Sequence, residues 1–294
     1  MDPENERPSA DLIREYSRRI VTRLLKFGGS ILFHAATEIW RKLCRLTGRK
    51  LPPIVVVVYY HKVSKVERTR LARQLDCLMR WTRPMRVDDT ELVSAGTRFV
   101  TITADDGWLS FAENGVPELA RRRIPLTLFA ISNRLGSTID GTTNDRLVTA
   151  DELCRLKSDL ITIGSHTATH RDMTTLDEYE ALLELRESRT KLTDIISEDV
   201  KLFCFPYGAY SEKLIALCRE AGYERAFTGM PELANPQAFV IGRVRVDPAD
   251  WAPEFYLKIM GAYRWIPGAI ALKRRILNGL HGQSPGFSRL RDPL

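Results

Sequence analysis

Short apolar runs alternate along this chain with longer segments whose apolar residues recur every three or four positions. The apolar runs lie at 54–60, 99–104, 126–131, 160–163, 200–205, 226–228 and 239–246. Their length and composition are typical of strands that are buried on both faces, as in parallel sheets. Helices are predicted at 69–81, 108–121, 175–196, 211–221, 253–263 and 265–281, and one more is predicted to begin at 150.

Several of these helices carry a start signal. Thr149 with Glu152, and Thr175 with Glu178, have the spacing of a capping box, in which the first side chain and the acid three residues later satisfy each other's backbone N–H groups. Ser211 is predicted to cap the helix that follows it. The strands and helices alternate about six times, which predicts an α/β fold around a parallel sheet, either a barrel or a doubly wound sheet.

The chain divides into three regions. Leu51-Pro52-Pro53 interrupts the helical pattern and predicts a boundary. We expect an amphipathic basic helical extension at 1–53, one large α/β domain at 54–263 and a basic amphipathic tail at 264–294.

Positive charge is concentrated at the two ends. The formal net charge is +7, of which residues 1–53 and 264–294 contribute +5 each, and the remaining residues contribute −3. Arginines fill the gaps between the apolar residues of Leu12–Leu25, a pattern found in helices that lie on anionic membrane surfaces. The alternatives are that this helix packs on the domain or that its basic face is simply solvated. Nucleic acid is not expected as a partner, because neither end carries a known reading motif.

The sequence also bears on location. The N-terminus lacks the pattern of a secretory signal, and the least polar early stretch, Phe27–Trp40, is shorter than the roughly 20 residues of a membrane span. The 5 cysteines show no paired spacing, which favours a reducing compartment. We therefore expect a cytoplasmic protein that contacts the inner face of the membrane through its basic ends.

Residues that can take part in catalysis or metal binding follow four of the predicted strands. His61 follows the first, Asp105 and Asp106 the second, His166 and His170 another, and Pro206-Tyr207 another. In parallel α/β folds the carboxyl ends of the strands carry the functional residues. Two adjacent acids are costly to bury unless a cation or hydrogen bonds compensate them, although Asp-Gly alone is also a common turn.

The two histidines supply a reason for the acids. At a spacing of four residues, one helical turn would place both rings of His166 and His170 on one face. Two neutral imidazoles and one carboxylate form a three-ligand site with open positions, and zinc is the default metal. The second acid is then available to take a proton from a metal-bound water.

Three motifs in this order resemble those of the polysaccharide deacetylases with a NodB homology domain, carbohydrate esterase family 4. They are Thr103-Ala104-Asp105-Asp106-Gly107, His166-Thr167-Ala168-Thr169-His170 and Phe205-Pro206-Tyr207-Gly208. The resemblance extends from about Ile54 to Tyr263 and implies a distorted (β/α)7-8 barrel of the NodB type, here with extra N- and C-terminal helices. It also implies a hydrolase that removes acetyl or similar acyl groups from an N-acetylated sugar, oligosaccharide or lipid-linked glycan, with Zn²⁺, or Co²⁺, Ni²⁺ or Mn²⁺, as cofactor.

By motif position, the resemblance implies a role for each residue. Asp105 would be the general base, and Asp106, His166 and His170 would be the metal ligands. The backbone N–H of Tyr207 would stabilise the oxyanion of the tetrahedral intermediate. Tyr60-His61-Lys62-Val63 resembles the branch of the family in which the first strand supplies the catalytic acid, so His61 is expected to protonate the leaving amine.

The substrate-binding residues are expected to be Pro206, Trp251 and Arg243. Trp251 follows Val246–Asp250 in a segment that resembles the family's Asp-Trp motif and would form a wall of the acetyl pocket. Two positions depart from the family pattern: Ala104 stands where an aromatic residue is usual, and Cys204 stands where an arginine often orients the base. Arg243 or Arg245, at the end of a later strand, is a candidate replacement for that arginine, with surface pairing as the alternative.

Two other functions use the same residues. A catalytically impaired relative that serves as a binding or scaffold protein in polysaccharide assembly would explain Ala104 and Cys204. An iron oxygenase with a two-histidine, one-carboxylate site would explain the ligands but would leave Asp105 without a function.

Overall fold

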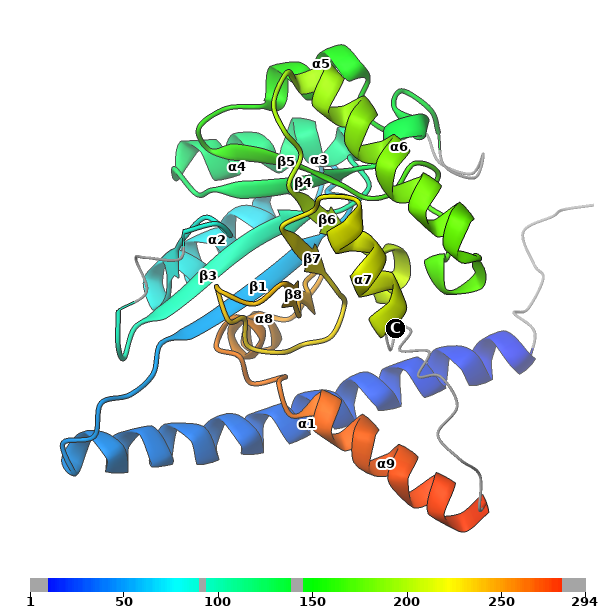
Figure 1. Cartoon of the computed structure of the whole chain (residues 1–294). Helices are drawn as coiled ribbons and strands as arrows, with labels where there is room; N and C mark the ends of the chain where they lie inside the picture. The colour runs from blue at the N-terminus through cyan, green and yellow to red at the C-terminus, as the bar shows by residue number, and fades with distance from the viewer. Residues whose placement is uncertain (1–9, 90–93, 139–144, 282–294) are drawn as a thin grey trace, which may run out of the picture.

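The computed structural model of the chain describes residues 10–89, 94–138 and 145–281. Its centre is a sheet of parallel strand pairs in the order β8-β7-β6-β5-β4-β3-β1-β9, with β2 paired to β3 outside this path. The strands are β1 (Ile54–Tyr60), β2 (Arg83–Pro84), β3 (Arg98–Ala104), β4 (Leu126–Ala130), β5 (Ile161–Ser165), β6 (Leu202–Cys204), β7 (Arg225–Phe227), β8 (Val240–Ile241) and β9 (Val244–Arg245). The sheet curls into a half-barrel whose edge strands, β8 and β9, are consecutive in the chain (Figure 1). The predicted α/β class and distorted barrel are confirmed.

The register of the strands brings the predicted functional residues to one rim. Tyr60 at the end of β1 pairs with Ala104 at the end of β3, so His61 and Asp105 leave the sheet side by side. The backbone N–H of Asp105 still donates to the carbonyl of Tyr60 (3.0 Å). The backbone of His166 continues β5 in the same way, by donating to β4. The carboxyl ends of four neighbouring strands therefore share one edge, as expected for parallel strands.

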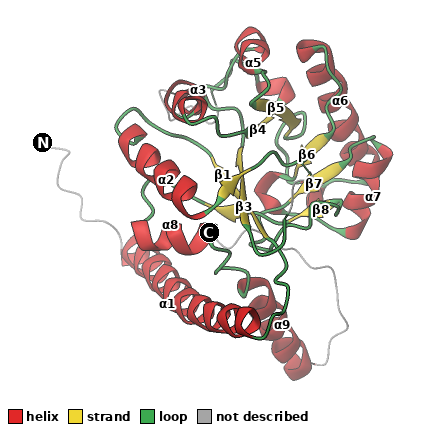
Figure 2. Ribbon diagram, turned by 90° about the vertical axis from the view of Figure 1, so that its left-hand side faces the viewer, coloured by secondary structure: helices red, strands yellow, loops and turns green. Residues whose placement is uncertain are grey.

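Helices cover the outside of the sheet (Figure 2). They are α2 (Arg68–Trp81), α3 (Leu109–Asn114), α4 (Val116–Arg121), α5 (Ala150–Leu156), α6 (Glu178–Ile196), α7 (Glu212–Glu220) and α8 (Ala252–Ile259), with short 3-10 turns η1 (Ser132–Arg134), η2 (Met173–Thr175) and η3 (Pro206–Gly208). All seven residues of β1 are buried, and Leu71, Leu75 and Leu78 of α2 are buried in the same core. Burial of each such leucine contributes roughly 1.5–3 kcal/mol to the free energy of folding, so the residues at the rim are supported by a tightly packed core.

Within the region expected to be a helical extension, the structure has one continuous helix, α1 (Ala10–Leu46). At 1.5 Å per residue it is about 55 Å long, and it lies along one side of the barrel (Figure 1). One face of α1 packs on the domain: Arg23 donates to Glu254 of α8 (3.0 Å), and Ser30 accepts a hydrogen bond from Trp265 (3.0 Å). The C-terminal helix α9 (Ile266–His281) begins next to this contact.

The structure confirms one predicted helix start, corrects a second and divides one predicted helix in two. The capping box at Thr149 is confirmed. The one predicted at Thr175 is wrong, because Asp172 draws residues 173–175 into a 3-10 turn and Asp177 caps α6 instead, accepting from the N–H of Glu180 (2.8 Å). The helix predicted at 108–121 is divided into α3 and α4 at Gly115.

The strand predicted at 239–246 is also divided. β8 and β9 flank Gly242 and Arg243, which lie outside the strands, and both of these residues are buried. A side chain at Gly242 would place its Cβ only 2.5 Å from the carbonyl oxygen of Met230, so only glycine permits this close approach.

Candidate metal centre and active site

Three of the predicted metal ligands converge at the rim. The Nε2 atoms of His166 and His170 lie 3.5 and 3.4 Å from the same oxygen, Oδ1 of Asp106. The rings of the two histidines are 4.9 Å apart between centroids. Asp106 and His166 are buried, and His170 is partly exposed toward the cavity described below.

The predicted helical turn between the two histidines is wrong. Residues 166–170 form a loop in which Thr167 (φ 67°) and His170 (φ 67°) adopt left-handed backbone conformations. Thr167 stabilises this loop by accepting a hydrogen bond from the backbone N–H of His170 (2.9 Å). Glu184 of α6 accepts another from the N–H of Thr169 (2.8 Å). The rings therefore meet because the loop folds back on itself, not because they share one face of a helix.

Each ligand is held by a second group that sets its orientation. The Nδ1–H of His166 donates to the carbonyl of Cys204 (2.8 Å), an assignment that leaves the Nε2 lone pair directed at Asp106. Trp108 Nε1–H donates to Oδ2 of Asp106 (2.8 Å), which leaves Oδ1 for another partner. Burial and the neighbouring His166 lower the pKa of His170 to about 4, so its imidazole is neutral near pH 7.

These residues fit a divalent cation. Oδ1 of Asp106 is buried and has no hydrogen-bond partner among the described residues, although it faces two imidazole nitrogens. An ionised oxygen in such a place is costly unless a cation satisfies it. Two neutral imidazoles and one carboxylate with an open side form the donor set of catalytic zinc sites and of related divalent metals.

A second cluster has metal-binding residue types but a different role. Asp105, His166 and Cys204 also lie within 4.8 Å of one another. The Arg243 guanidinium already occupies this cluster, and burial raises the pKa of the Cys204 thiol well above its usual value. The positive charge of this guanidinium and the protonated thiol of Cys204 both oppose metal binding. A buried thiol is also inert, so Cys204 is excluded as a nucleophile.

Arg243 is the residue that holds Asp105. Its Nη1 and Nη2 donate to the two oxygens of Asp105 at 2.7 and 2.8 Å, in the bidentate geometry that is strongest for this pair. Other donors go to Thr103 Oγ1 (2.9 Å), Cys204 Sγ (2.8 Å) and the carbonyl of Thr228 (3.2 Å). Burial alone would raise the pKa of Asp105, but the charge and hydrogen bonds of Arg243 outweigh it and bring this pKa to about 2.

The bidentate contact with Asp105 favours the alternative that Arg243 replaces the family arginine over the substrate-binding role. The Arg243 side chain is 1% exposed, and its donors are directed at protein atoms. The other candidate, Arg245, is exposed and lines the cavity instead.

A cavity of about 710 Å³ opens over the centre. It is lined by the acid pair, both histidines of the loop, His61, Tyr207 and Arg245, among others. Burial lowers the pKa of His61 below its ordinary value of 6.5. Tyr207 is half-exposed, packs edge-on against His170 (4.9 Å between centroids) and has a left-handed backbone (φ 58°). The cavity thus brings together the predicted base, acid, ligands and oxyanion residue.

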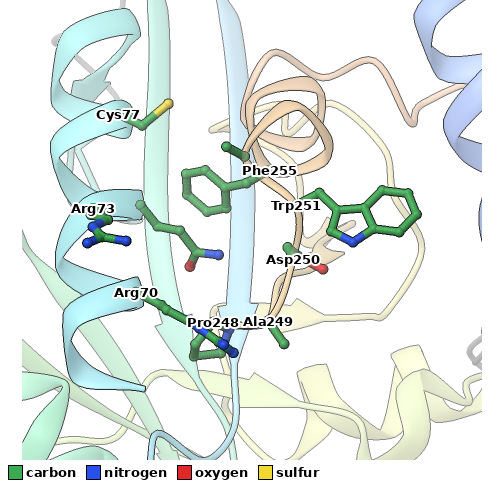
Figure 3. Close-up of a pocket in the computed structure, with 10 residues that line it drawn as sticks. Arg70, Arg73, Cys77, Pro248, Ala249, Asp250, Trp251 and Phe255 are labelled. Carbon is green, nitrogen blue, oxygen red and sulfur yellow. The ribbon is translucent and has the colours of Figure 1, made fainter. Parts of the chain in front are cut away.

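Two predicted substrate contacts do not line this cavity. Pro206 is buried at the start of the turn η3, where its fixed φ begins the 3-10 conformation that presents Tyr207. Trp251 lies in a separate hollow of about 450 Å³ between α2 and α8, and its ring extends away from the α2 residues Arg70 and Arg73 (Figure 3). It packs edge-on against Phe27 of α1 (5.8 Å between centroids). Neither side chain therefore lines the cavity over the metal ligands: Pro206 is buried in the protein, and Trp251 packs against α1.

Some supporting residues gave little signal in the sequence. Trp108 directly follows Asp105-Asp106-Gly107, so its place beside the acid pair could have suggested a partner for one of them. Glu184 gave no such signal, because a glutamate on a charged helix resembles any solvated residue.

A parallel half-barrel with an acid pair and two histidines at its rim matches the class of protein that the motifs predicted. Residues 93–226 match the family model of polysaccharide deacetylase. The YxkH protein of Bacillus subtilis (strain 168), provisionally named a polysaccharide deacetylase, is 21% identical over 210 residues, which are 67% of this chain and 73% of that protein. The resemblance to the polysaccharide deacetylases is thus confirmed, with the family model matching residues 93–226.

Solved structures share the fold. IcaB from Ammonifex degensii superposes with a TM-score of 0.61 at 23% identity, over 71% of this chain and 98% of that one. A de-N-acetylase from Aggregatibacter actinomycetemcomitans gives 0.59 at 16% identity, over 67% and 96%. The Streptococcus pyogenes deacetylase PplD gives 0.56 at 17% identity, over 72% and 98%. At these identities the likeness establishes the architecture of the barrel.

Proposed function

We propose that this protein is a metal-dependent deacetylase that hydrolyses an acetyl or similar acyl group on an N-acetylated sugar, oligosaccharide or lipid-linked glycan. The observation that carries the proposal is that two adjacent carboxylates, Asp105 and Asp106, lie in two different environments. Asp106 turns a buried, unpartnered oxygen toward two imidazoles, while Asp105 beside it is held ionised by Arg243. One acid is thus suited to hold a cation and the other to accept a proton.

Asp106, His166 and His170 would hold the metal, with Zn²⁺ the first candidate and Co²⁺, Ni²⁺ or Mn²⁺ the others. A bound divalent cation supplies a water of lowered pKa and polarises the acyl carbonyl.

The neighbouring residues would then move the protons. Asp105 accepts the proton of the attacking water, and the fixed guanidinium of Arg243 keeps its carboxylate ionised and in one orientation. A carboxylate with a pKa of about 2 is a weak base, so its contribution depends on the acidity of the water it deprotonates. His61, at the end of the neighbouring strand β1, delivers a proton to the leaving amine, and the Tyr207 N–H donates to the developing oxyanion.

The test combines metal analysis with acetate release from N-acetylglucosamine oligomers. We expect Asp106→Asn to lose both the metal and the activity. Asp105→Asn is expected to keep the metal and lose activity by a factor of about 10²–10⁴, the usual contribution of a general base. Asp76→Asn is the matched control, since this exposed carboxylate on α2 lies in a surface ion pair with Arg122. Undiminished acetate release in Asp105→Asn would disprove its role as base, and a wild-type protein that retains no metal would disprove the metal site.

A catalytically impaired binding protein is the second candidate. One of its two motivations was the missing arginine at Cys204, and Arg243 now supplies that contact from another strand end. Stoichiometric bound metal without hydrolysis across a broad panel of acetylated glycans would favour this candidate. Iron-dependent oxygen uptake would favour an oxygenase, for which the Asp105–Arg243 pair has no function.

A further inference from the structure

The outward face of α1 is apolar over most of its length. Large aliphatic side chains that are 54–75% exposed recur along it: Val21, Leu25, Leu32, Ile39, Leu43 and Leu46. At 3.6 residues per turn these six positions fall within a sector of about 60°, on the side of the helix opposite the buried Ser30 and Arg41. The stripe from Val21 to Leu46 is about 38 Å long at 1.5 Å per residue. Scattered exposed leucines are ordinary, but a continuous apolar stripe of this length marks an interaction surface.

Helix α9 extends this surface. Leu272, Ile276 and Leu277 are half-exposed on it. α9 starts where Trp265 packs against the middle of α1, and both figures place the two helices together on one side of the barrel (Figures 1 and 2). We call the exposed apolar residues of α1 and α9 named in these two paragraphs the apolar face.

The charges around the apolar face have one sign. On α1, the exposed Arg18 and Lys42 flank the apolar stripe at 100° per residue, whereas Arg19, Arg23, Lys26 and Arg41 lie on the side of the helix that faces the barrel. The single acid of residues 17–50 is Glu38, which forms an ion pair with Arg98 of the barrel. α9 adds Lys273, Arg274 and Arg275 and contains no acid. An apolar stripe bordered by cations is complementary to a bilayer that contains anionic lipids, which provides both a hydrocarbon boundary and negative headgroups.

We propose that α1 and α9 dock the protein in the plane of an anionic lipid bilayer through the apolar face. Among the described residues no helix is long and apolar enough to cross a membrane, so the contact is with the surface. A second copy of the chain is a poorer occupant of this face. Pairing two copies through it would bring two cationic borders together, and like charges across an interface disfavour association.

The inward side of α1, behind the apolar face, lies next to the candidate active site. A further cavity of about 530 Å³ separates α1 from the barrel, and Arg19, Arg23 and Lys26 of α1 line one side of it. Gly229 and Arg245 line both this cavity and the one over the metal ligands. A protein docked through the outward face of α1 would therefore hold its catalytic cavity behind α1, separated from the headgroups by about one helix diameter, roughly 10–12 Å. The docking itself does not depend on the proposed reaction.

The experiment is co-sedimentation of the full chain with large vesicles, either pure phosphatidylcholine or a mixture with 30% phosphatidylglycerol, at low and high salt. We expect binding to the anionic vesicles, weakened by salt and by removal of the anionic lipid. Leu25→Glu/Leu32→Glu is expected to weaken it at least about tenfold, because each substitution replaces an inserted side chain with a charge of the wrong sign. Leu272→Glu/Ile276→Glu, on α9, is expected to act in the same direction.

Val66→Glu/Leu183→Glu is the matched control, since both of these apolar side chains are also exposed but lie away from α1 and α9. It should bind as the wild type does, and all variants should keep the wild-type thermal unfolding temperature because the substituted positions are exposed. The proposal is overturned if the wild type binds neither vesicle, or if the control loses as much binding as Leu25→Glu/Leu32→Glu. It is also overturned if Leu25→Glu/Leu32→Glu leaves binding unchanged, or if it instead dissociates a dimer detected by light scattering. None of these outcomes requires that acetate be released, so failure here and failure of the proposed reaction are distinguishable.

Discussion

Removing Arg243 should expose how much the active site depends on one ion pair. In Arg243→Met the partner Asp105 stays buried, at 3% exposure, but loses both of the hydrogen bonds that hold its oxygens. Methionine occupies a similar length of side chain without charge, so the change acts mainly on the pair. Arg243→Lys should not restore the wild type, because an ammonium cannot make the bidentate contact.

The expected magnitude follows from the pKa of Asp105. Its ordinary value is 3.8, and burial would raise it further, yet Arg243 holds it at about 2. The difference of nearly 2 pKa units corresponds to about 2–3 kcal/mol, and the opposing effect of burial makes this a lower limit for the effect of Arg243. Loss of one partner of a buried ion pair typically destabilises by about 3–5 kcal/mol. We therefore expect Arg243→Met to lower the free energy of unfolding by about 3–4 kcal/mol at pH 7.

The sign of the pH dependence is fixed by the same shift. Because the folded-state pKa of Asp105 is lowered, the pair stabilises the protein fully above pH 3.8, and this stabilisation is lost as the pH falls toward about 2. In Arg243→Met the lone carboxylate has a raised pKa and takes up a proton more readily than in the unfolded chain. The deficit relative to the wild type should therefore shrink as the pH is lowered from neutral toward about 4.

The assay is a double-mutant cycle of Arg243→Met and Asp105→Asn, measured by urea unfolding. The double variant removes both charges, so it should be less destabilised than the sum of the single variants by about 2 kcal/mol or more. A coupling free energy below about 0.5 kcal/mol would refute the reasoning, because pairs that do not interact are additive within that margin.

Three further outcomes are expected. In the metal-free protein the pKa of His170 is about 4 against an ordinary 6.5, so the free energy of unfolding should fall by about 3 kcal/mol as the pH drops through that range, and His170→Gln should flatten this part of a urea-unfolding series. Trp251→Ala should cost about 1 kcal/mol through its contact with Phe27 while the KM for N-acetylated oligomers stays unchanged; a raised KM would return Trp251 to the acetyl pocket. Cys204→Arg should unfold at lower urea than Cys204→Arg/Arg243→Met, since two guanidiniums would then share one buried carboxylate; equal midpoints would contradict this.

The strand ends are the part of the site that the sequence predicts well. Continuous apolar runs such as 54–60 and 99–104 specify buried parallel strands, and the polar residues directly after them must meet at one rim. For this reason the sequence alone places the acid pair at one rim with His61 and the two later histidines. The prediction used only periodicity and the direction of the strands, both of which are local properties.

Contacts between residues that are far apart in the sequence could not be predicted from local sequence patterns. Arg243 lies 138 positions after Asp105, in a turn that the apolar pattern of 239–246 represents as one strand. What divides that strand is the buried ion pair and the close approach at Gly242, neither of which leaves a periodic signal. The position of the Trp251 side chain was missed for a related reason, since it packs on Phe27, a residue of α1 that lies far away in the sequence.

The backbone around the centre gives a reason for metal binding to matter to the fold as well as to the reaction. Asp106, Thr167, His170 and Tyr207 all have positive φ, which costs roughly 1–3 kcal/mol at a residue other than glycine. They are gathered at one rim, where three of them position the carboxylate, the imidazole and the N–H of the proposed reaction. A cation at the Asp106 oxygen would bind only the folded arrangement, and a ligand at 100 times its dissociation constant stabilises by about 2.7 kcal/mol. That amount is comparable to the cost of one or two of these conformations, so the strained rim and its ligand set are best understood as one energetic unit.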